Sequence, residues 1–565
     1  MLLLLLALGQ EKAILEIDPG TEVRLAGGAR RGNDGLEFSS AAQHAEVDPP
    51  KGLDGIEAMS VGGWFLPKEA GEQLFFHRGS IEAGPNGERL FRPNPGWVNF
   101  LVGTDRRGFF MGAVNGNGTM PFPFVTLNPV VPGTWNQLVV VKTAGGHQKF
   151  YQNGALVWTD LDAAAAPKVT PFREKSPGEP VRLSMPLGGT VGEAWVHARE
   201  LGAEEVRKDY EAKKERFRPA PPGRPVGLRE MDAHPAHDLW PEPVTRENWP
   251  ATRERILRGV REIFGTMPAE RAPLEPRVLG EEDCGTYVRR KVSIQVEPGD
   301  RMPAYLLVPK GLKVRAPAVL CFYGTTSGAG KETTVGLSGP QPGTPPAKNR
   351  AFAVDMAEAG FVAFAADYLR DGERVTPGRR PYDTTQFYAK HPEWSIHGKD
   401  AWDSMRAIDY LQSLDAVDGE RIGMVGHSYG GHSTIFTMMF EPRIKAGWAN
   451  GPVSDFVRHG MHWASPKGAG SSQSLPAMRP YLLEKRPPPL AFYEATALVA
   501  PRALAVGQAV GELRPREEEN CAAVGEVYRA LGAGDRVRYV WYPGDHDFPP
   551  HVRREAVAWL RRWLR

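Results

Sequence analysis

The chain has 565 residues, of which 41% are hydrophobic and 24% are charged. Its 69 Lys and Arg residues nearly balance its 67 Asp and Glu residues, so the formal net charge is +2 at pH 7. This length exceeds what one hydrophobic core usually organises, so we expect two or more domains. The balanced charge, without a basic stripe, argues against a nucleic-acid-binding protein. The three cysteines, Cys284, Cys321 and Cys521, are scattered and predict neither a disulfide framework nor a metal site.

The first nine residues, Met1 to Gly9, form an apolar run with five consecutive leucines. This run is too short to span a bilayer, which needs about 20 residues. It resembles the apolar region of a secretory signal with small residues at Ala7 and Gly9, although the basic start of such a signal is missing. The sequence therefore predicts a cleaved signal and a secreted or periplasmic protein; a cytoplasmic protein with a ragged terminus is the alternative. We expect no membrane insertion elsewhere.

Residues 14–213 are predicted to form an all-β domain. Short apolar and aromatic runs alternate with glycine, proline and asparagine, as in a β-sandwich. Asn153-Gly154 between two apolar runs supplies the positive φ angles of a two-residue turn and predicts a β-hairpin. The predicted strands are Met59–Leu66, Leu74–His77, Val98–Val102, Gly108–Val114, Gln137–Lys142, Lys149–Gln152 and Ala155–Trp158.

The hairpin, the strand Trp135–Val141 and the closing segment Gly192–His197 resemble a laminin-G or concanavalin A-like jelly roll. The resemblance implies a domain that binds glycans, in some relatives through calcium, or a domain that only packs against its neighbour. Both interpretations stay open, and the sequence names no metal ligands.

Residues 214–249 are rich in proline and charge and predict a semi-rigid linker. Residues 250–565 begin with an amphipathic helix over Thr252–Phe264 and then alternate strand and helix patterns, which favours a mostly parallel sheet with helices on both faces. The predicted strands are Tyr287–Val296, Met302–Val308, Ala318–Tyr323, Val362–Ala366, Ile422–Val425, Ala446–Asn450, Ala503–Val506 and Val537–Tyr542.

A Gly-x-Ser-x-Gly motif with Ser428 at its centre stands between the strand Ile422–Val425 and a helical pattern over Ser433–Phe440. In that context it predicts a nucleophile elbow, a tight turn that exposes the serine hydroxyl at the positive end of a helix. A serine nucleophile needs a base within hydrogen-bond reach. His546 follows the last predicted strand, in a loop over the same edge of the sheet, and is the candidate base.

The acid of the expected triad has two candidates. The turn after Ala503–Val506 is where an aspartate is usual, but Val510 occupies that position and Glu512 follows two residues later. A short insertion in the turn would bring Glu512 into place. Asp455, after the preceding strand, is the alternative acid, and its other interpretation is a helix N-cap.

Backbone N–H groups after the strand Ala318–Tyr323 and at Tyr429 are placed to stabilise an oxyanion. We favour Thr325 as the donor from the first loop, with Thr326 as the second candidate.

Candidate residues of the substrate pocket are Tyr323, Trp394 and Trp463. Trp463 lies in the long insert Phe456–Leu490. This insert would form an apolar flap over the mouth of the pocket or a simple surface excursion.

The elbow and several other stretches resemble the dienelactone hydrolase and acetyl xylan esterase-like branch of the α/β-hydrolases over roughly Trp249–Arg565. The other stretches are Tyr323-Gly324-Thr325-Thr326, Asp367–Arg374, Ala500-Pro501-Arg502 and Pro543–His546. The resemblance implies a serine carboxylic-ester hydrolase that works through a triad and an acyl-enzyme, without a cofactor or metal. It also implies acetyl or related carbohydrate-linked esters as substrates, with a polysaccharide as the candidate partner.

The chain departs from these relatives at several places. Tyr323 stands where many of them have histidine. Glucuronoyl esterases usually have cysteine before the serine and arginine after it, where this chain has His427 and Tyr429.

Two other functions stay open. One is a serine peptidase of the oligopeptidase type, although the amino-terminal region lacks the repeats of roughly 40 residues that form a propeller. The other is a glycan-binding protein whose hydrolase domain has lost activity, which the irregular acid turn suggests. The acyl group, the alcohol and the oligomeric state are not determined by the sequence.

Overall fold

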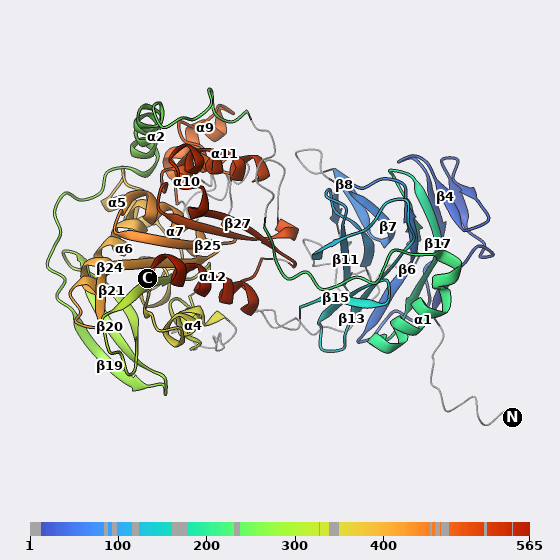
Figure 1. The fold of residues 1–565 in the computed structure, drawn as a ribbon, viewed down its shortest axis with the longest axis horizontal. Coiled ribbons are helices and arrows are strands. Elements are labelled where there is room, and N and C mark those ends of the chain that lie inside the picture. Colours follow the sequence, from blue (N-terminus) through green and yellow to red (C-terminus); the bar gives the residue numbers. More distant parts are fainter. Residues whose placement is uncertain are drawn as a thin grey trace.

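The structure is a computed structural model that describes residues 13–83, 89–92, 99–115, 124–160, 178–230, 238–326, 328–337, 350–452, 455–457, 464, 474–512, 517–544 and 546–565. Figure 1 shows a β-sandwich, coloured blue to blue-green, beside an α/β domain coloured green to red. The predicted fold class, a jelly-roll sandwich followed by an α/β-hydrolase fold, is confirmed. The run Met1–Gly9, in which the export signal is predicted, lies outside the described residues.

Two antiparallel sheets form the sandwich. The strands are β1 (Leu15–Ile17), β2 (Arg24–Ala26), β3 (Arg30–Arg31), β4 (Leu36–Phe38), β5 (His44–Val47), β6 (Met59–Pro67), β7 (Gln73–Arg78), β10 (Asn99–Thr104), β11 (Phe109–Asn115), β12 (Phe124–Pro129), β13 (Asn136–Lys142), β14 (Gln148–Gln152), β15 (Ala155–Thr159), β16 (Val181–Leu183) and β17 (Gly189–His197), while β8 (Ser80–Ala83) and β9 (Arg89–Arg92) make a separate ribbon. One sheet has the order β15-β14-β13-β6-β17-β4-β3, with β1 beside β17, and the other β12-β11-β10-β7-β16-β5-β2. The predicted hairpin is confirmed, because Asn153 and Gly154 join β14 to β15 with φ angles of 50° and 79°.

The segment predicted as a linker is bound to both domains. Its first residues, 214–217, belong to the last turn of helix α1 (Ala203–Phe217), and the Phe217 ring stacks on Trp64 of the sandwich at 4.5 Å. The side-chain amide of Asn153 then donates to the carbonyl oxygen of Ala220 at 3.0 Å. Further along, the Trp240 indole is buried in the second domain and donates to the Ala523 carbonyl at 2.9 Å. The connection is therefore packed at both of its ends.

The second domain is built on a sheet of order β18-β27-β26-β25-β24-β22-β23-β21-β20-β19. The strands are β18 (Arg229–Glu230), β19 (Arg277–Asp283), β20 (Tyr287–Glu297), β21 (Asp300–Pro309), β22 (Ala316–Phe322), β23 (Val362–Ala366), β24 (Val417–His427), β25 (Ile444–Asn450), β26 (Ala503–Ala509) and β27 (Val537–Tyr542). The strands from β27 to β23 in this order are parallel, and the outer pairs are antiparallel. The parallel strands bring their carboxyl ends to one edge.

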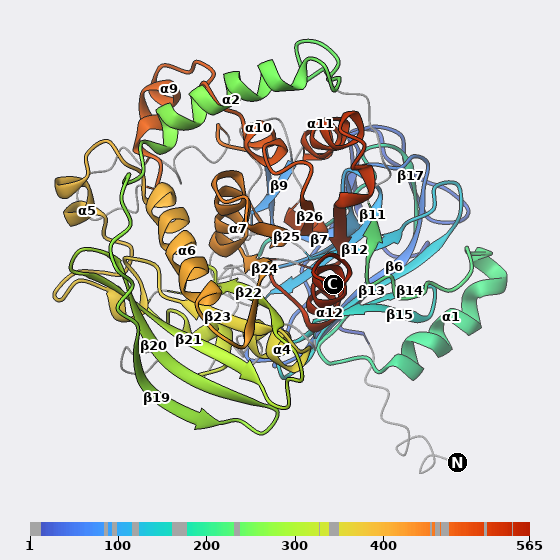
Figure 2. The same ribbon diagram turned by 60° about the vertical axis from the view of Figure 1, so that its left-hand side comes forward.

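Helices cover both faces of this sheet, as predicted (Figure 2). The long helices α6 (Ile396–Gln412) and α7 (Tyr429–Phe440) lie on one face with α2 (Trp249–Phe264), α10 (Phe492–Ala497) and α11 (Glu517–Ala530) around them. Helices α4 (Phe352–Glu358) and α12 (Pro550–Trp563) lie on the other. Shorter elements are α3 (Glu332–Val335), α5 (Thr385–Lys390), α9 (Arg479–Leu483) and the 3-10 turns η2 (Gly372–Arg374), η3 (Pro476–Met478), η4 (Val510–Glu512) and η5 (Gly534–Arg536). Within the ranges given above, no helix is both long and apolar enough to cross a membrane.

Candidate active site

Ser428 forms the turn between the central strand β24 and helix α7. Its backbone has φ 57° and ψ −117°, a conformation that is costly for a residue with a side chain. The flanking glycines make this turn possible. A Cβ at Gly426 would lie 2.0 Å from the Gly430 carbonyl oxygen, and a Cβ at Gly430 would lie 1.9 Å from that of Phe322. The motif therefore folds as the predicted elbow, with the serine hydroxyl above the edge of the sheet.

The three predicted residues Ser428, His546 and Glu512 meet in one hydrogen-bonded chain. His546 Nε2 lies 2.7 Å from Ser428 Oγ, and His546 Nδ1 lies 2.6 Å from Glu512 Oε1. A carboxylate at Nδ1 holds the proton on that nitrogen, so that Nε2 is left to accept the serine proton. The side chains of His546 and Glu512 are 39% and 20% exposed, so the imidazole is open to solvent.

Neighbouring parallel strands explain why residues so far apart in sequence meet. Ser428 follows β24, Glu512 ends the η4 turn after β26, and His546 follows β27. All three positions therefore lie at the carboxyl edge of the same sheet. The Gln508 side-chain amide donates to the second carboxylate oxygen of Glu512 at 3.2 Å and fixes the orientation of the carboxylate.

The alternative acid, Asp455, has a different local role. Its carboxylate accepts a hydrogen bond from the Val457 N–H at 2.8 Å, a short-range turn contact. Of the two predicted acids, Glu512 is the one on the His546 ring. The irregular turn is accommodated because β26 continues to Ala509 and η4 then advances the chain to Glu512.

The candidate oxyanion loop approaches Ser428 closely at Gly324. A Cβ on Gly324 would lie 2.8 Å from Ser428 Cβ and 3.4 Å from its Oγ, so only glycine leaves this side of the nucleophile open. Thr325 follows and is exposed. The Thr326 N–H instead donates to the Tyr382 hydroxyl at 2.8 Å, and its own hydroxyl donates to Asp371. The geometry therefore favours Thr325 over Thr326 as the partner of the Tyr429 amide.

The Tyr429 side chain points away from the nucleophile into a buried polar cluster. Its hydroxyl accepts a hydrogen bond from Arg370 at 2.6 Å and donates one to Asp400 at 2.5 Å. Burial raises the pKa of Asp400 to about 6, although Arg370 and the Tyr429 hydroxyl oppose that shift. This cluster anchors the first residue of α7, whose amide is a candidate oxyanion donor.

The predicted pocket residues are placed differently. Tyr323 is buried, and its hydroxyl accepts a hydrogen bond from the Tyr368 N–H at 3.1 Å, so its ring is part of the support beneath the loop. Trp394 is buried against Phe387 and Trp402. Trp463 lies outside the described residues. A substrate contact by any of the three stays a prediction.

Sequence reasoning assigned no role to Asn450 and only a packing or capping role to His427, but both contact the segment that carries the candidate base His546. The His427 ring packs on that of His546 with centroids 4.8 Å apart. Burial, together with the nearby His546 ring, lowers the pKa of His427 well below its ordinary value, so the ring is neutral at pH 7. The Asn450 amide contacts His427 Nδ1 at 3.1 Å and donates to the Asp547 carbonyl oxygen at 2.9 Å. The Ser428 N–H donates to the Asn450 carbonyl at 2.8 Å, which links elbow and base loop.

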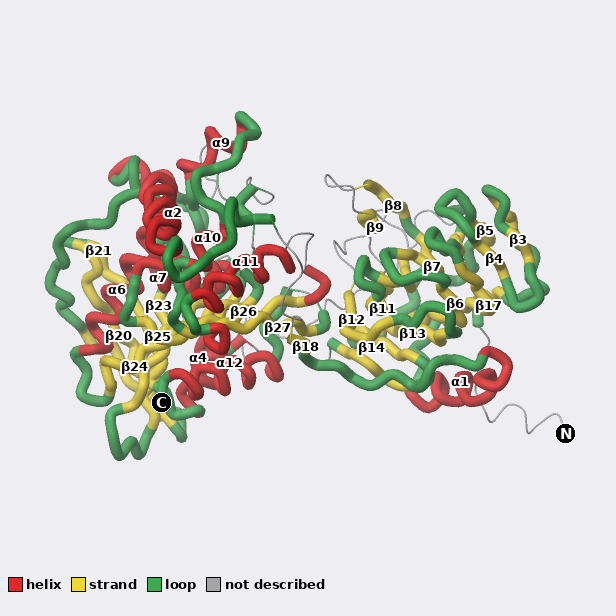
Figure 3. Tube along the Cα trace, turned by 45° about the horizontal axis from the view of Figure 1, so that its top comes forward, coloured by secondary structure: helices red, strands yellow, loops and turns green. Residues whose placement is uncertain are grey.

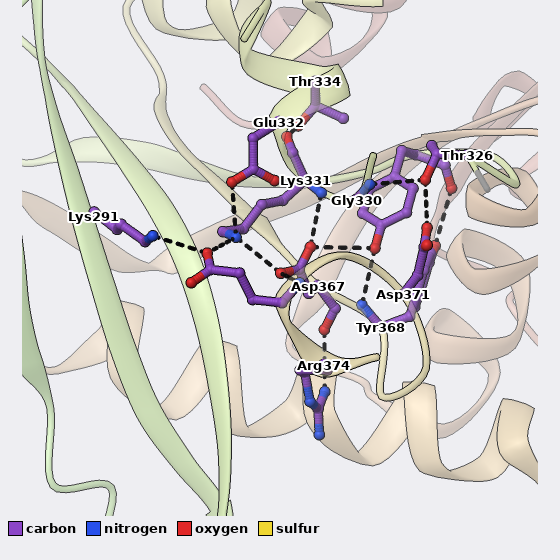
Figure 4. A network of polar contacts seen from close by, with 12 residues as sticks. Lys291, Thr326, Gly330, Lys331, Glu332, Thr334, Asp367, Tyr368, Asp371 and Arg374 are labelled. Carbon is purple, nitrogen blue, oxygen red and sulfur yellow. Dashed lines mark hydrogen bonds and ion pairs between the residues drawn. The ribbon is translucent and has the colours of Figure 1, made fainter. Parts of the chain in front are cut away.

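A buried network of charges lies beneath the oxyanion loop (Figure 4). Lys331 and Asp367 are fully buried and form an ion pair of 2.8 Å, with Glu332 and Glu373 within 3.1 Å and 2.5 Å of the same ammonium group. Burial alone would lower the pKa of Lys331, but the three carboxylates outweigh it and raise the pKa above its usual range. The Lys331 N–H also donates to Asp367 at 2.8 Å, so the network fixes the end of the loop that begins at Gly324.

We expect Lys331→Met to lower the free energy of unfolding of the hydrolase domain by roughly 3–5 kcal/mol, because it leaves a buried carboxylate unpaired. The matched control is Lys310→Met, which breaks a largely exposed pair with Asp283 and should cost less than about 1 kcal/mol. Urea titration of both variants measures the difference. Equal effects of the two substitutions would show that the network does not support the loop.

Comparison with known proteins adds family relationships to this geometry. The sequence model of the Abhydrolase family matches residues 228–544, and that of the Concanavalin A-like lectin/glucanases superfamily matches residues 39–207. YtaP of Bacillus subtilis (strain 168), a protein named only as a hydrolase, is 27% identical over 334 residues, which are 55% of this chain and 98% of YtaP.

Two solved structures are also similar. A glucuronoyl esterase from Solibacter usitatus is 21% identical, with a TM-score of 0.45 over 56% of this chain and 93% of that one. A glucuronoyl esterase from Teredinibacter turnerae T7901 is 19% identical, with a TM-score of 0.43 over 56% and 86% of the two chains.

Proposed function

The chain belongs to the Abhydrolase family, and from this premise we propose that it is a serine carboxylic-ester hydrolase with Ser428 as nucleophile, His546 as base and Glu512 as acid. The observation that carries the proposal is the pair of contacts on one imidazole, 2.7 Å to the serine hydroxyl and 2.6 Å to the carboxylate. A histidine with a purely structural role would not require hydrogen bonds to a serine in a strained turn at one ring nitrogen and to a carboxylate at the other. This arrangement is that of an activated nucleophile.

The proposed reaction passes through an acyl-enzyme. Ser428 Oγ attacks the acyl carbon while His546 Nε2 takes its proton, and the Glu512 carboxylate stabilises the imidazolium. The amides of Thr325 and Tyr429 donate to the oxyanion of the tetrahedral intermediate. His546 then returns its proton to the leaving alcohol. In the second half, His546 takes a proton from water as the water oxygen attacks the acyl carbon, and it returns this proton to Ser428 Oγ as the bond between that oxygen and the acyl carbon breaks and the carboxylic acid is released. The scheme uses no cofactor.

For the substrate we propose acetyl or related esters on carbohydrates. Two similar solved structures are named as glucuronoyl esterases, and the amino-terminal domain matches a lectin and glucanase superfamily. A polysaccharide is therefore the partner we propose.

The two competing functions have less support. A peptidase of the oligopeptidase type would gate its site with a propeller, whereas the amino-terminal domain is a two-sheet sandwich. The inactive glycan-binding protein was suggested by the irregular acid turn, and Glu512 now lies against His546.

A panel of esters tests the proposal. Purified protein is assayed on p-nitrophenyl acetate and longer p-nitrophenyl esters, on acetylated xylan and on a methyl glucuronoyl ester, and a fluorophosphonate probe reports the reactive serine. We expect labelling of Ser428 and hydrolysis of at least one ester, with acetyl preferred over long acyl chains. A folded protein that neither takes up the probe nor cleaves any ester would contradict the proposal and favour the binding function.

A further inference from the structure

We propose that the β-sandwich is a positioning element of the active site, which holds the turn of Glu512 and the loop of His546 in place. The inference rests on the triad proposed above and concerns what keeps it assembled. Figure 3 shows β12 of the sandwich next to β27 and β18 of the hydrolase domain.

The outer face of one sandwich sheet is apolar and buried. On β11, Phe110 and Val114 belong to the core between the two sheets, whereas Phe109, Met111 and Ala113 point to the opposite side, as strand periodicity requires. These three are 2–7% exposed. The outer face of an antiparallel sandwich sheet is usually solvated. Here its side chains form one cluster with two residues of the hydrolase domain, Val510 and Trp541.

Those two residues belong to the segments that carry the base and the acid. Val510 begins the η4 turn that ends at Glu512. Trp541 lies near the end of β27, from which the chain runs to His546. Val510 and Trp541 are 2% and 8% exposed, so each is held almost entirely by its contacts. The sandwich therefore packs against both segments from one side.

A backbone hydrogen bond also joins the sandwich to the loop of His546. The Gly544 N–H, in the loop of His546, donates to the Val125 carbonyl oxygen of β12 at 2.9 Å. Gly544 has φ 112°, and a Cβ there would lie 3.3 Å from Trp158 of β15, whose ring packs on Phe124 at 5.2 Å. A backbone hydrogen bond between the domains thus fixes the loop two residues before the base.

Arg107, in the turn between β10 and β11, contacts Glu518 and Trp541 of the hydrolase domain. Its Nε lies 2.7 Å from the Glu518 carboxylate in the first turn of α11. Its guanidinium lies over the Trp541 ring at 4.8 Å. Arg107 is only 12% exposed, so the ion pair is partly shielded from solvent.

These contacts matter because the catalytic hydrogen bonds are short and the segments that carry them are loops. Loops open more easily than strands, and a catalytic group displaced by about 1 Å loses up to roughly 10²-fold in rate. A large apolar interface suppresses the relative motion that two domains otherwise have. The sandwich thereby restricts the motion of Glu512 and His546 without contacting the reacting atoms.

The experiment compares full-length variants. Arg107→Ala and Glu518→Gln remove the same ion pair from its two sides, and Trp158→Ala removes the wall beside Gly544. We expect each to lower kcat on p-nitrophenyl acetate by about tenfold or more with KM nearly unchanged, and to alter the pH profile of kcat/KM, because the imidazole is less well held. The double variant of Arg107 and Glu518 should lose no more than Arg107→Ala alone, which also removes the contact with the Trp541 ring.

The matched control is Arg199→Ala, which removes an ion pair of 2.8 Å with Glu205 within the sandwich and should leave kcat at the wild-type value. Glu518→Gln is the variant least able to disturb folding, because its side chain is 29% exposed. If the wild type is active and Arg107→Ala and Glu518→Gln match its kcat and pH profile, this inference is wrong and the proposed function stands. A folded wild type without esterase activity would overturn both.

Discussion

Ser428→Ala is expected to lower kcat/KM for ester hydrolysis by about 10⁴–10⁶-fold, because in the proposed mechanism no other group forms the acyl-enzyme. The substitution keeps Cβ and the strained turn, so the free energy of unfolding should stay within about 0.5 kcal/mol of the wild type. Rates on p-nitrophenyl acetate and urea unfolding curves measure the two quantities. The fluorophosphonate label should disappear with the activity.

The matched control for this experiment is Ser413→Ala. Ser413 ends helix α6 just before β24, at the opposite edge of the sheet from Ser428. Its hydroxyl donates to the Tyr410 carbonyl at 2.7 Å and has no part in the proposed reaction. Wild-type rates are therefore expected. Ester hydrolysis that survives in Ser428→Ala at more than about a hundredth of the wild-type rate would refute this nucleophile.

Glu512→Ala is expected to lower kcat by about 10²–10⁴-fold, with a small change in KM. Without the carboxylate at Nδ1, the imidazole loses its orientation and the charge that stabilises the imidazolium. Glu512→Asp keeps the charge but shortens the side chain by one methylene group, so partial activity should return. Steady-state kinetics on one ester measure the series.

The informative comparison is with Asp455→Ala. Asp455 is the other acid compatible with the fold, and its carboxylate contacts the N–H of Val457. We expect this variant to keep kcat within about twofold of the wild type, because a turn contact of this kind contributes only about 1 kcal/mol to local stability. A larger loss in Asp455→Ala than in Glu512→Ala would reverse the assignment of the acid.

The elbow illustrates what short-range sequence can predict. A buried strand, small residues around Ser428 and a helix pattern are all encoded within about 20 neighbouring residues, and the close approaches of Gly426 and Gly430 leave no room for larger side chains. His546 was predicted almost as directly, because the carboxyl ends of parallel strands share one edge. For the acid the sequence left two candidates, Glu512 and Asp455, because the advance of the chain through η4 depends on packing that a motif does not encode.

Other features of the site and of the domain interface depend on contacts between residues far apart in the sequence. The Thr326 N–H is taken up by the Tyr382 hydroxyl, 56 positions away, and no local pattern around either residue indicates this pair. A short apolar and aromatic run, Gly108–Val114, predicted β11, and both faces of that strand proved to be buried, but such a run cannot tell what covers the outer face. The stretch Asp367–Arg374 stood out as a family likeness without a role, and the structure places it in the charge network under the oxyanion loop.

The amino-acid sequence by itself determined the two domain types, most strands, the elbow at Ser428 and the histidine after the last strand. These features depend on periodicity, turn chemistry and topology that residues close together in the chain encode. Only the tertiary structure placed Glu512, and not Asp455, against His546, singled out the amide taken up by Tyr382, and brought the sandwich against the segments of His546 and Glu512. Each of those outcomes is a hydrogen bond or a packed surface between residues far apart in the chain, and its energy depends on distances that exist only in the folded molecule.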